Sequence, residues 1–198
     1  MSEASRQPVL LVLSGPSAVG KTTVAQRLLA ECPNLTRMVT CTTRAPREGE
    51  VDGVDYHFLS DKEFCQRIEA GEFLEHAQVY QHRYGTLKSS VTEAFKAGKD
   101  VLIVNDVQGA LALQAMARAD VELSGSLKTV FMILKDVDTL RARILSRGAE
   151  DEGAIEDRLS IAEAEMAQAA AFDHVIESRT RDEDFERVRE IYLKHAGI

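Results

Sequence analysis

The run from residue 15 to residue 22 combines glycines, a lysine and a threonine in an order suited to binding phosphate. It reads Gly15-Pro16-Ser17-Ala18-Val19-Gly20-Lys21-Thr22 and fills every fixed position of the pattern G-x-x-x-x-G-K-S/T. Such a loop turns backbone N–H groups toward an anion, and the helix after it adds the partial positive charge of its N-terminus. Lys21 can reach β- and γ-phosphates, and the Thr22 hydroxyl can bind Mg²⁺. We expect this run, with Thr23, to hold a nucleotide phosphate chain.

A strand before this loop and a helix after it must position it. Residues 9–13 form a continuous apolar run, which is typical of a buried parallel strand. Residues 23–30 predict a helix with Val24 and Leu28 on one face. This strand–loop–helix context favours a phosphate site over a glycine turn that merely joins two elements.

Two arginines outside the loop have the spacing to grip a second phosphate. Arg44 and Arg47 lie three residues apart in a segment that also contains Pro46. Paired guanidinium groups can bind a phosphate monoester bidentately, which lysine does less well. Tyr56 and Tyr84 could add hydroxyl donors. The alternative is that these arginines only form a solvated face.

The composition limits the class of protein. With 198 residues and 44% hydrophobic side chains, the chain predicts one large domain or one core with insertions. A net charge of −8 argues against general binding to nucleic acid or membranes. Cys32, Cys41 and Cys65 show no C-x-x-C spacing, which favours reduced thiols and a cytoplasmic location. The five histidines show no ligand spacing, so we expect no zinc site.

Strand and helix patterns alternate along the rest of the chain. Strands are predicted at 38–42, 101–104, 130–134 and 175–176. Helices are predicted at 61–70 behind a capping box, at 89–97, at 108–119, from Asp136 through Leu145, at 155–166 and at the C-terminus, with a charged connector at 147–153. This alternation predicts an α/β fold whose parallel sheet binds ligands at the carboxyl ends of its strands. Residues 37–89 break the alternation and predict an inserted unit.

Four further segments resemble the signatures of the guanylate kinase family. They are V-T-C-T-T-R-A-P-R at 39–47, E-V-D-G-V-D-Y-H-F at 50–58, G-E-F-L-E-H-A at 71–77 with Y-G-T at 84–86, and R-x-x-x-R-G at 143–148 with R-L at 158–159. The resemblance implies a P-loop parallel-sheet core flanked by helices (8–36, 90–139 and 158–198), an inserted GMP-binding α+β unit (37–89) and a helical lid (140–157). It also implies phosphate transfer from ATP to GMP or dGMP with Mg²⁺, in a monomer or small homo-oligomer.

The resemblance assigns roles to individual residues. For GMP binding they are Thr40, Arg44, Arg47, Tyr56, Glu75, Tyr84, Thr86 and Asp106, and for catalysis Lys21, Arg44, Arg143, Arg147 and Arg158. Guanine presents N1–H and N2–H donors that one carboxylate can accept side by side, whereas adenine presents an acceptor at N1. Glu75 is therefore the expected base reader. Without the resemblance, Glu75 would be interpreted as an exposed carboxylate after a helix.

The chain departs from the family pattern at the end of the strand 101–104. The family has an acid, an apolar residue and an aspartate there, whereas this chain has Val104, Asn105 and Asp106. We expect activity to survive this change, because Thr22 and Asp106 remain. Two other functions stay open: a kinase for another small phosphate ester, such as ribose 1,5-bisphosphate, and a non-catalytic binding module related to guanylate kinase.

Overall fold

A five-stranded parallel sheet forms the centre of the molecule. The computed structural model describes residues 6–79, 81–135, 137–145 and 152–198. The strands follow the order β2-β7-β1-β8-β9, and every neighbouring pair is parallel. Their bounds are β1 Leu10–Ser14, β2 Leu35–Arg37, β7 Asp100–Val104, β8 Leu127–Ile133 and β9 His174–Glu177. This sheet confirms the predicted α/β class.

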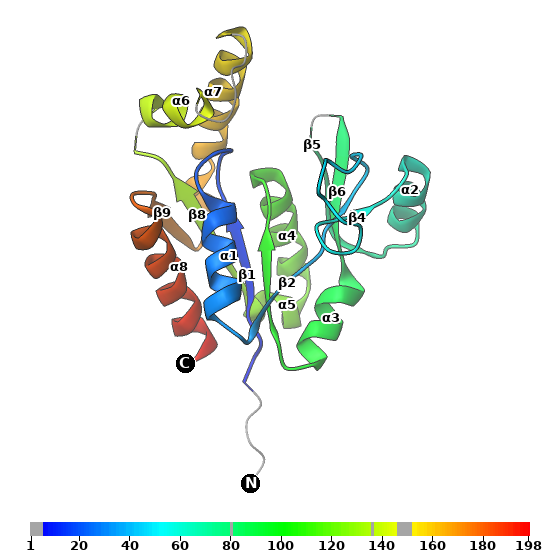
Figure 1. Ribbon diagram of the computed structural model, residues 1–198. Coiled ribbons are helices and arrows are strands. Elements are labelled where there is room, and N and C mark those ends of the chain that lie inside the picture. Colours follow the sequence, from blue (N-terminus) through cyan, green and yellow to red (C-terminus); the bar gives the residue numbers. More distant parts are fainter. Residues whose placement is uncertain (1–5, 80, 136, 146–151) are drawn as a thin grey trace.

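Helices cover both faces of the sheet (Figure 1). Those described are α1 Lys21–Glu31, α2 Asp61–Glu69, α3 Lys88–Lys96, α4 Val107–Ala119, α5 Val121–Ser126, α6 Val137–Leu145, α7 Glu152–Met166 and α8 Arg181–Ala196, with a short 3₁₀ helix at Ala169–Ala171. Helices α1 and α8 pack side by side on one face, and α4 lies on the other. None of the helices in the described segments is both long and apolar enough to cross a bilayer.

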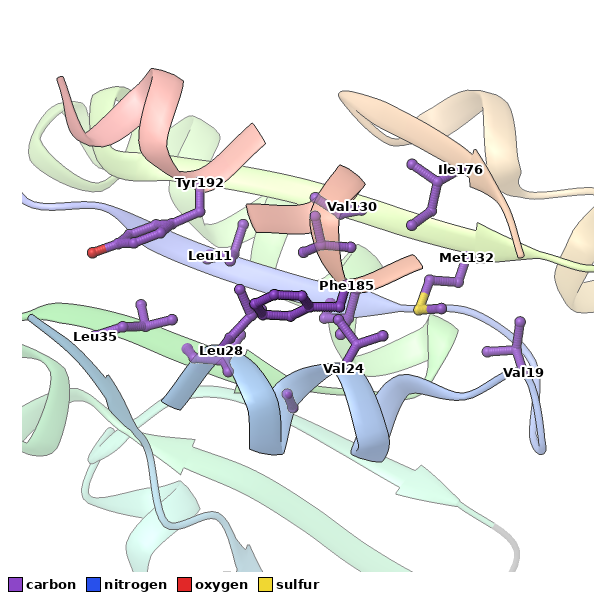
Figure 2. Close-up of a cluster of buried hydrophobic side chains, with 14 of the residues drawn as sticks. Leu11, Val19, Val24, Leu28, Leu35, Val130, Met132, Ile176, Phe185 and Tyr192 are labelled. Atoms are coloured by element: carbon purple, nitrogen blue, oxygen red, sulfur yellow. The ribbon is translucent and has the colours of Figure 1, made fainter. Parts of the chain in front are cut away.

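The core is built on alternate residues of β1. Leu11 and Leu13 pack with Leu28 of α1 and Phe185 of α8, and Figure 2 shows Phe185 close to Leu28 and Val24. Leu10 and Val12 point to the opposite face, where α4 covers them. Because helices cover both faces, all five residues of β1 are buried, and four of them, 10–13, belong to the apolar run 9–13 that predicted a buried strand.

A second sheet stands beside the core, within the segment predicted as an insertion. Its order is β4-β3-β6-β5, with bounds β3 Cys41–Thr42, β4 His57–Phe58, β5 Phe73–Val79 and β6 His82–Leu87. The predicted capping box at α2 is confirmed. The Ser60 side chain accepts a hydrogen bond from the Glu63 backbone N–H, and the Glu63 side chain accepts one from the Ser60 backbone N–H. Figure 1 shows this unit on one side of the core, and α6 and α7 rising over the sheet on the other side.

The single strand predicted at 38–42 is wrong. The chain instead makes β2 in the core sheet, crosses through residues 38–40, and enters the second sheet as β3. Met38 marks the crossing, since its N–H still bonds the Leu102 carbonyl of β7 while its side chain joins the core. The predicted range therefore contains only β3 and the crossing segment, and β2 lies just before it. Asp136 and residues 147–151 of the predicted connector lie outside the described residues.

Asp100, at the start of β7, ties three parts of the core together. Its buried carboxylate accepts hydrogen bonds from Arg6 Nη2 (2.9 Å), Val9 N (2.8 Å), Asn34 Nδ2 (3.1 Å) and Tyr192 Oη (2.7 Å). Burial alone would raise the pKa of Asp100, but these donors outweigh it and lower the pKa. The network should therefore stabilise the fold above the unfolded pKa of an aspartate and lose that stabilisation as the pH falls.

We expect Tyr192→Phe to lower the free energy of unfolding by about 1.5–3 kcal/mol at pH 7, because it removes a hydrogen bond to a charged group. The loss should shrink only as the pH falls well below 4, through the lowered pKa of Asp100 in the folded protein, where its carboxylate becomes protonated. Urea unfolding of both proteins at pH 7 and at a pH well below 4 measures it. An equal loss at the two pH values would mean that packing of the ring, rather than the Asp100 bond, is what the variant disturbs.

Candidate active site

The loop between β1 and α1 has the backbone shape that phosphate binding requires. Gly15 has a φ of 138°, and a Cβ at this position would lie 2.3 Å from the Met132 carbonyl oxygen of β8. Only glycine fits there, because the loop backbone rests directly on the neighbouring strand. Gly20, also at positive φ, forms the N-cap of α1. The loop therefore presents the helix N-terminus at the carboxyl edge of the sheet.

Ala18 is the one residue other than glycine with a positive φ among those described, at 66°. The left-handed region costs an L-residue about 1–2 kcal/mol. The strain falls in the middle of the phosphate loop, where strained backbone is typical of ligand-binding sites.

Lys21 and Thr22 stand at the start of α1. Lys21 Nζ donates to the carbonyl oxygens of Gly15 (2.5 Å) and Pro16 (3.0 Å), so its ammonium lies over the loop. Thr22 is exposed. In the described part of the chain, no three His, Cys, Asp or Glu side chains gather at a metal site. A hydroxyl together with nucleotide phosphates and water nevertheless suits Mg²⁺, which keeps several waters and prefers oxygen ligands.

A cavity of about 220 Å³ opens between the second sheet and the carboxyl end of β7. It is lined by Arg37, Met38, Thr40, Tyr56, Tyr84, Val104, Asn105 and Asp106. Four of the predicted GMP residues thus meet at one place: Thr40, Tyr56, Tyr84 and Asp106. The volume lies below the roughly 300–1,000 Å³ of typical ligand pockets, so a nucleotide would be only partly enclosed here.

Arg44 lies beside this cavity and is held by its own loop. Both Glu50 carboxylate oxygens accept from Arg44 Nη2, at 2.8 and 2.9 Å, and the guanidinium lies 5.3 Å from the centre of the Tyr56 ring. The hydrogen bond from Arg44 lowers the pKa of Glu50. Glu50 also accepts from the Arg47 backbone N–H, while the Arg47 side chain is exposed. An incoming phosphate would therefore compete with Glu50 for Arg44.

Glu75 is buried, contrary to what its sequence surroundings alone suggest. Only 4% of it is exposed, and its Oε1 accepts from Thr86 Oγ1 at 2.8 Å and from Asn105 Nδ2 at 3.3 Å. A bulge in the pairing of β5 with β6 lies between Phe73 and Glu75, and it lets Phe73, Leu74 and Glu75 be buried in succession. Burial raises the pKa of Glu75 to about 7, against the hydrogen bonds from Thr86 and Asn105.

Asn105 and Asp106, directly after β7, line the same cavity, and Asn105 also bonds Glu75. The Asn105 N–H bonds the Leu13 carbonyl at 3.2 Å, which sets this strand end beside the start of the phosphate loop. Asp106 caps α4 by accepting from Gly109 N at 2.9 Å. The link between Asn105 and Glu75 was not predicted from the sequence. The one feature of the sequence that could have indicated this contact is a polar residue, Asn105, directly after a buried strand.

The three predicted lid arginines are placed less completely. Arg158 lies on the exposed side of α7. Arg143 belongs to α6, although its side chain is not among those described, and Arg147 lies outside the described residues. The structure thus gathers four of the eight predicted GMP residues around one cavity, beside the end of the strand that leads into the phosphate loop, and the roles of the lid arginines stay predictions.

Known proteins with similar sequences and structures are guanylate kinases, in agreement with this arrangement of the site. The guanylate kinase family model matches residues 7–195. Guanylate kinases from Wolbachia sp. subsp. Brugia malayi (39% identical over 194 residues, 96% of each chain) and Symbiobacterium thermophilum (44% over 168 residues, 85% of this chain and 76% of the relative) are similar. The crystal structure of guanylate kinase from Anaplasma phagocytophilum matches with a TM-score of 0.74 and 31% identity, over 94% of this chain and 85% of that one. Because these matches span almost its whole length, the chain belongs to the guanylate kinase family of phosphotransferases.

Proposed function

We propose that this protein transfers the γ-phosphate of ATP to GMP and dGMP, producing ADP and GDP or dGDP. The observation that carries this proposal is the buried carboxylate of Glu75, held at the same sheet edge as an intact phosphate loop. A phosphate loop alone would fit many NTP-binding proteins, whereas a positioned carboxylate selects guanine as the acceptor base.

The reaction needs positioning and charge neutralisation more than proton transfer. A phosphate oxygen of GMP forms a bond to the γ-phosphorus while the bond to the β–γ bridging oxygen breaks, and ADP leaves with that electron pair. The attacking oxygen is already ionised, so no general base is required. Lys21 and the loop N–H groups would hold the donor phosphates, while Arg44 and Arg47 would aim the acceptor phosphate.

Mg²⁺ fits the start of α1, where Thr22 would hold it together with the nucleotide phosphates; when bound, it neutralises charge on the phosphoryl oxygens. The lid arginines Arg143, Arg147 and Arg158 would add positive charge around the transferred group. Closure of the lid would also exclude water, which limits wasteful hydrolysis of ATP.

An ADP-release assay with a panel of acceptors tests the proposal. GMP, dGMP, AMP, UMP and ribose 1,5-bisphosphate are compared at equal concentration, with ATP and Mg²⁺ in excess. We expect GMP and dGMP to be phosphorylated well above the other three. Preference for ribose 1,5-bisphosphate would support a kinase for a different phosphate ester. No transfer to any acceptor would support a binding module, a reading that the intact loop does not favour.

We further propose that the unit 37–89 and the lid 140–157 close over the core 8–36, 90–139 and 158–198 when both nucleotides bind. Its support is the small cavity, and the exposed positions of Arg47 and Arg158. Spin labels on cysteines introduced at the exposed positions Lys62 and Asp157, with Cys65 replaced by serine, report the distance between α2 and α7. We expect that distance to shorten only when GMP and a non-hydrolysable ATP analogue are added together.

We also propose that the protein acts in the cytoplasm as a monomer or small homo-oligomer. The described cysteines are all unpaired, with Cys32 and Cys41 buried, which suits a reducing compartment. Light scattering at several protein concentrations would measure the oligomeric state.

A further inference from the structure

The side chain of Asn105 is placed by a hydrogen bond on one side and by free space beside a glycine on the other. It is 8% exposed, and its Nδ2 donates to Glu75 Oε1 at 3.3 Å across the boundary between the core and the second sheet. On its other side, a Cβ at Gly109 would lie 2.9 Å from Asn105 Nδ2 and 3.3 Å from its Cγ. The missing side chain of Gly109 therefore provides the space that the amide occupies.

We propose that Asn105 is a positioning residue for guanine selection, whose amide favours the ionised form of the Glu75 carboxylate and fixes its orientation. This inference rests on the proposed function. It concerns a position where the family pattern has an apolar residue, which could fill the space but could not donate to Glu75.

The charges around Glu75 explain why the donor matters. Burial and the nearby charge of Asp106 both favour the protonated form of Glu75, whereas the Thr86 hydroxyl and the Asn105 amide favour the ionised form. The balance puts the pKa of Glu75 at about 7. Loss of the amide should therefore leave Glu75 largely protonated at neutral pH. A protonated carboxyl can direct its O–H at the guanine N1–H, so that donor faces donor.

The same contact also restricts the direction of the carboxylate. Thr86 and Asn105 donate to the same oxygen, Oε1, from β6 and from the end of β7. A carboxylate offers about four acceptor positions, so two donors leave capacity for the base. Without Asn105, the hydroxyl of Thr86 alone would hold the group, and hydroxyls rotate freely.

Asn105→Leu tests the proposal, because leucine keeps the volume and removes the donor. We expect kcat/KM for GMP at pH 7 to fall about fivefold, mostly through KM, and its acid limb to move up by about one pH unit. The loss should largely disappear at pH 9, and KM for ATP should stay unchanged. Calorimetric titration with GMP alone should show the same shift without any turnover.

Gly109→Ala provides a second variant that leaves Asn105 itself in place. Its added methyl group would contact the far end of a flexible side chain, so we expect the protein to fold and the amide to move away from Glu75. Its acid limb for GMP should also move to higher pH. Gln114→Leu is the matched control, since Gln114 is an equally buried amide that bonds Thr129 and the Ala171 carbonyl instead. That control should leave the GMP acid limb where it is.

The outcomes distinguish failure of the proposed function from failure of the proposed role of Asn105. A wild-type protein that does not phosphorylate GMP would overturn the proposed function. A wild-type protein that does so, while Asn105→Leu and Gly109→Ala keep the wild-type acid limb and the wild-type GMP to AMP ratio, would overturn the role of Asn105 and leave the function standing. If Asn105→Leu fails to fold, Gly109→Ala decides.

Discussion

Lys21→Met is expected to reduce kcat for GMP phosphorylation by about 10²–10³-fold or more, as loss of a preorganised charge at a transferred group usually does. The Lys21 ammonium lies over the phosphate loop, where it bonds two loop carbonyls, so its charge is already placed for the donor phosphates. Methionine keeps the length of the side chain and removes the charge. Steady-state kinetics with GMP and saturating ATP measure the change.

The fold should survive this substitution, because the two carbonyls that Lys21 bonds belong to the partly buried loop directly before it, and not to another element of the core. Lys62→Met is the matched control, since Lys62 is exposed on α2, away from the loop. The control should keep wild-type kcat. If Lys21→Met retained near wild-type turnover with an unchanged melting temperature, the catalytic assignment of Lys21 would be wrong.

Features that depend on neighbours in the chain were predictable from the sequence. The phosphate loop is continuous in sequence, and so are the strand before it and the helix after it. The capping box at Ser60 and Glu63 is likewise a contact between residues three apart. For such features the residue pattern and the physical cause lie in the same short window, so the pattern predicts the structure directly.

Features that depend on distant parts of the chain were not predictable in the same way. Glu75 is buried because α4 and the end of β7 cover it, and the sequence of β5 alone does not predict that burial. The contact between Glu75 and Asn105 joins residues thirty positions apart. Residues 35–42 divide between two sheets because β2 pairs with β7 and β3 pairs with β6, and these partners belong to different units. In each case tertiary packing decides what the local pattern leaves open.

Glu75→Gln is expected to lower kcat/KM for GMP by about ten- to a hundredfold, because it replaces a charged acceptor with a donor. Thr86 and Asn105 both donate to Oε1, so the amide oxygen of glutamine should take that position. The amide nitrogen then stands in the place of Oε2 and turns an N–H toward the donor edge of guanine. Adenine presents an acceptor at N1, so discrimination against AMP should relax.

The pH dependence gives the same substitution a second readout. In the wild-type protein, kcat/KM for GMP should rise as the pH increases through about 7, where Glu75 ionises. Glutamine does not titrate, so this acid limb should disappear in Glu75→Gln. An unchanged limb in the variant would mean that another group controls it.

Burial of Glu75 also predicts the sign of the stability change. The pKa of Glu75 rises from 4.5 to about 7 on folding, so the folded state binds its proton more tightly and wild-type stability falls as the pH rises across that interval. The full cost of the buried charge above pH 7 is on the order of 3 kcal/mol. Glu75→Gln should therefore be more stable than wild type at pH 8 and similar at pH 4. If Glu75 recognises the base, the variant should be more stable and less active, with a lower ratio of kcat/KM for GMP to kcat/KM for AMP. An unchanged ratio would mean that Glu75 does not recognise the base, and the main reason for assigning GMP as the acceptor would be lost.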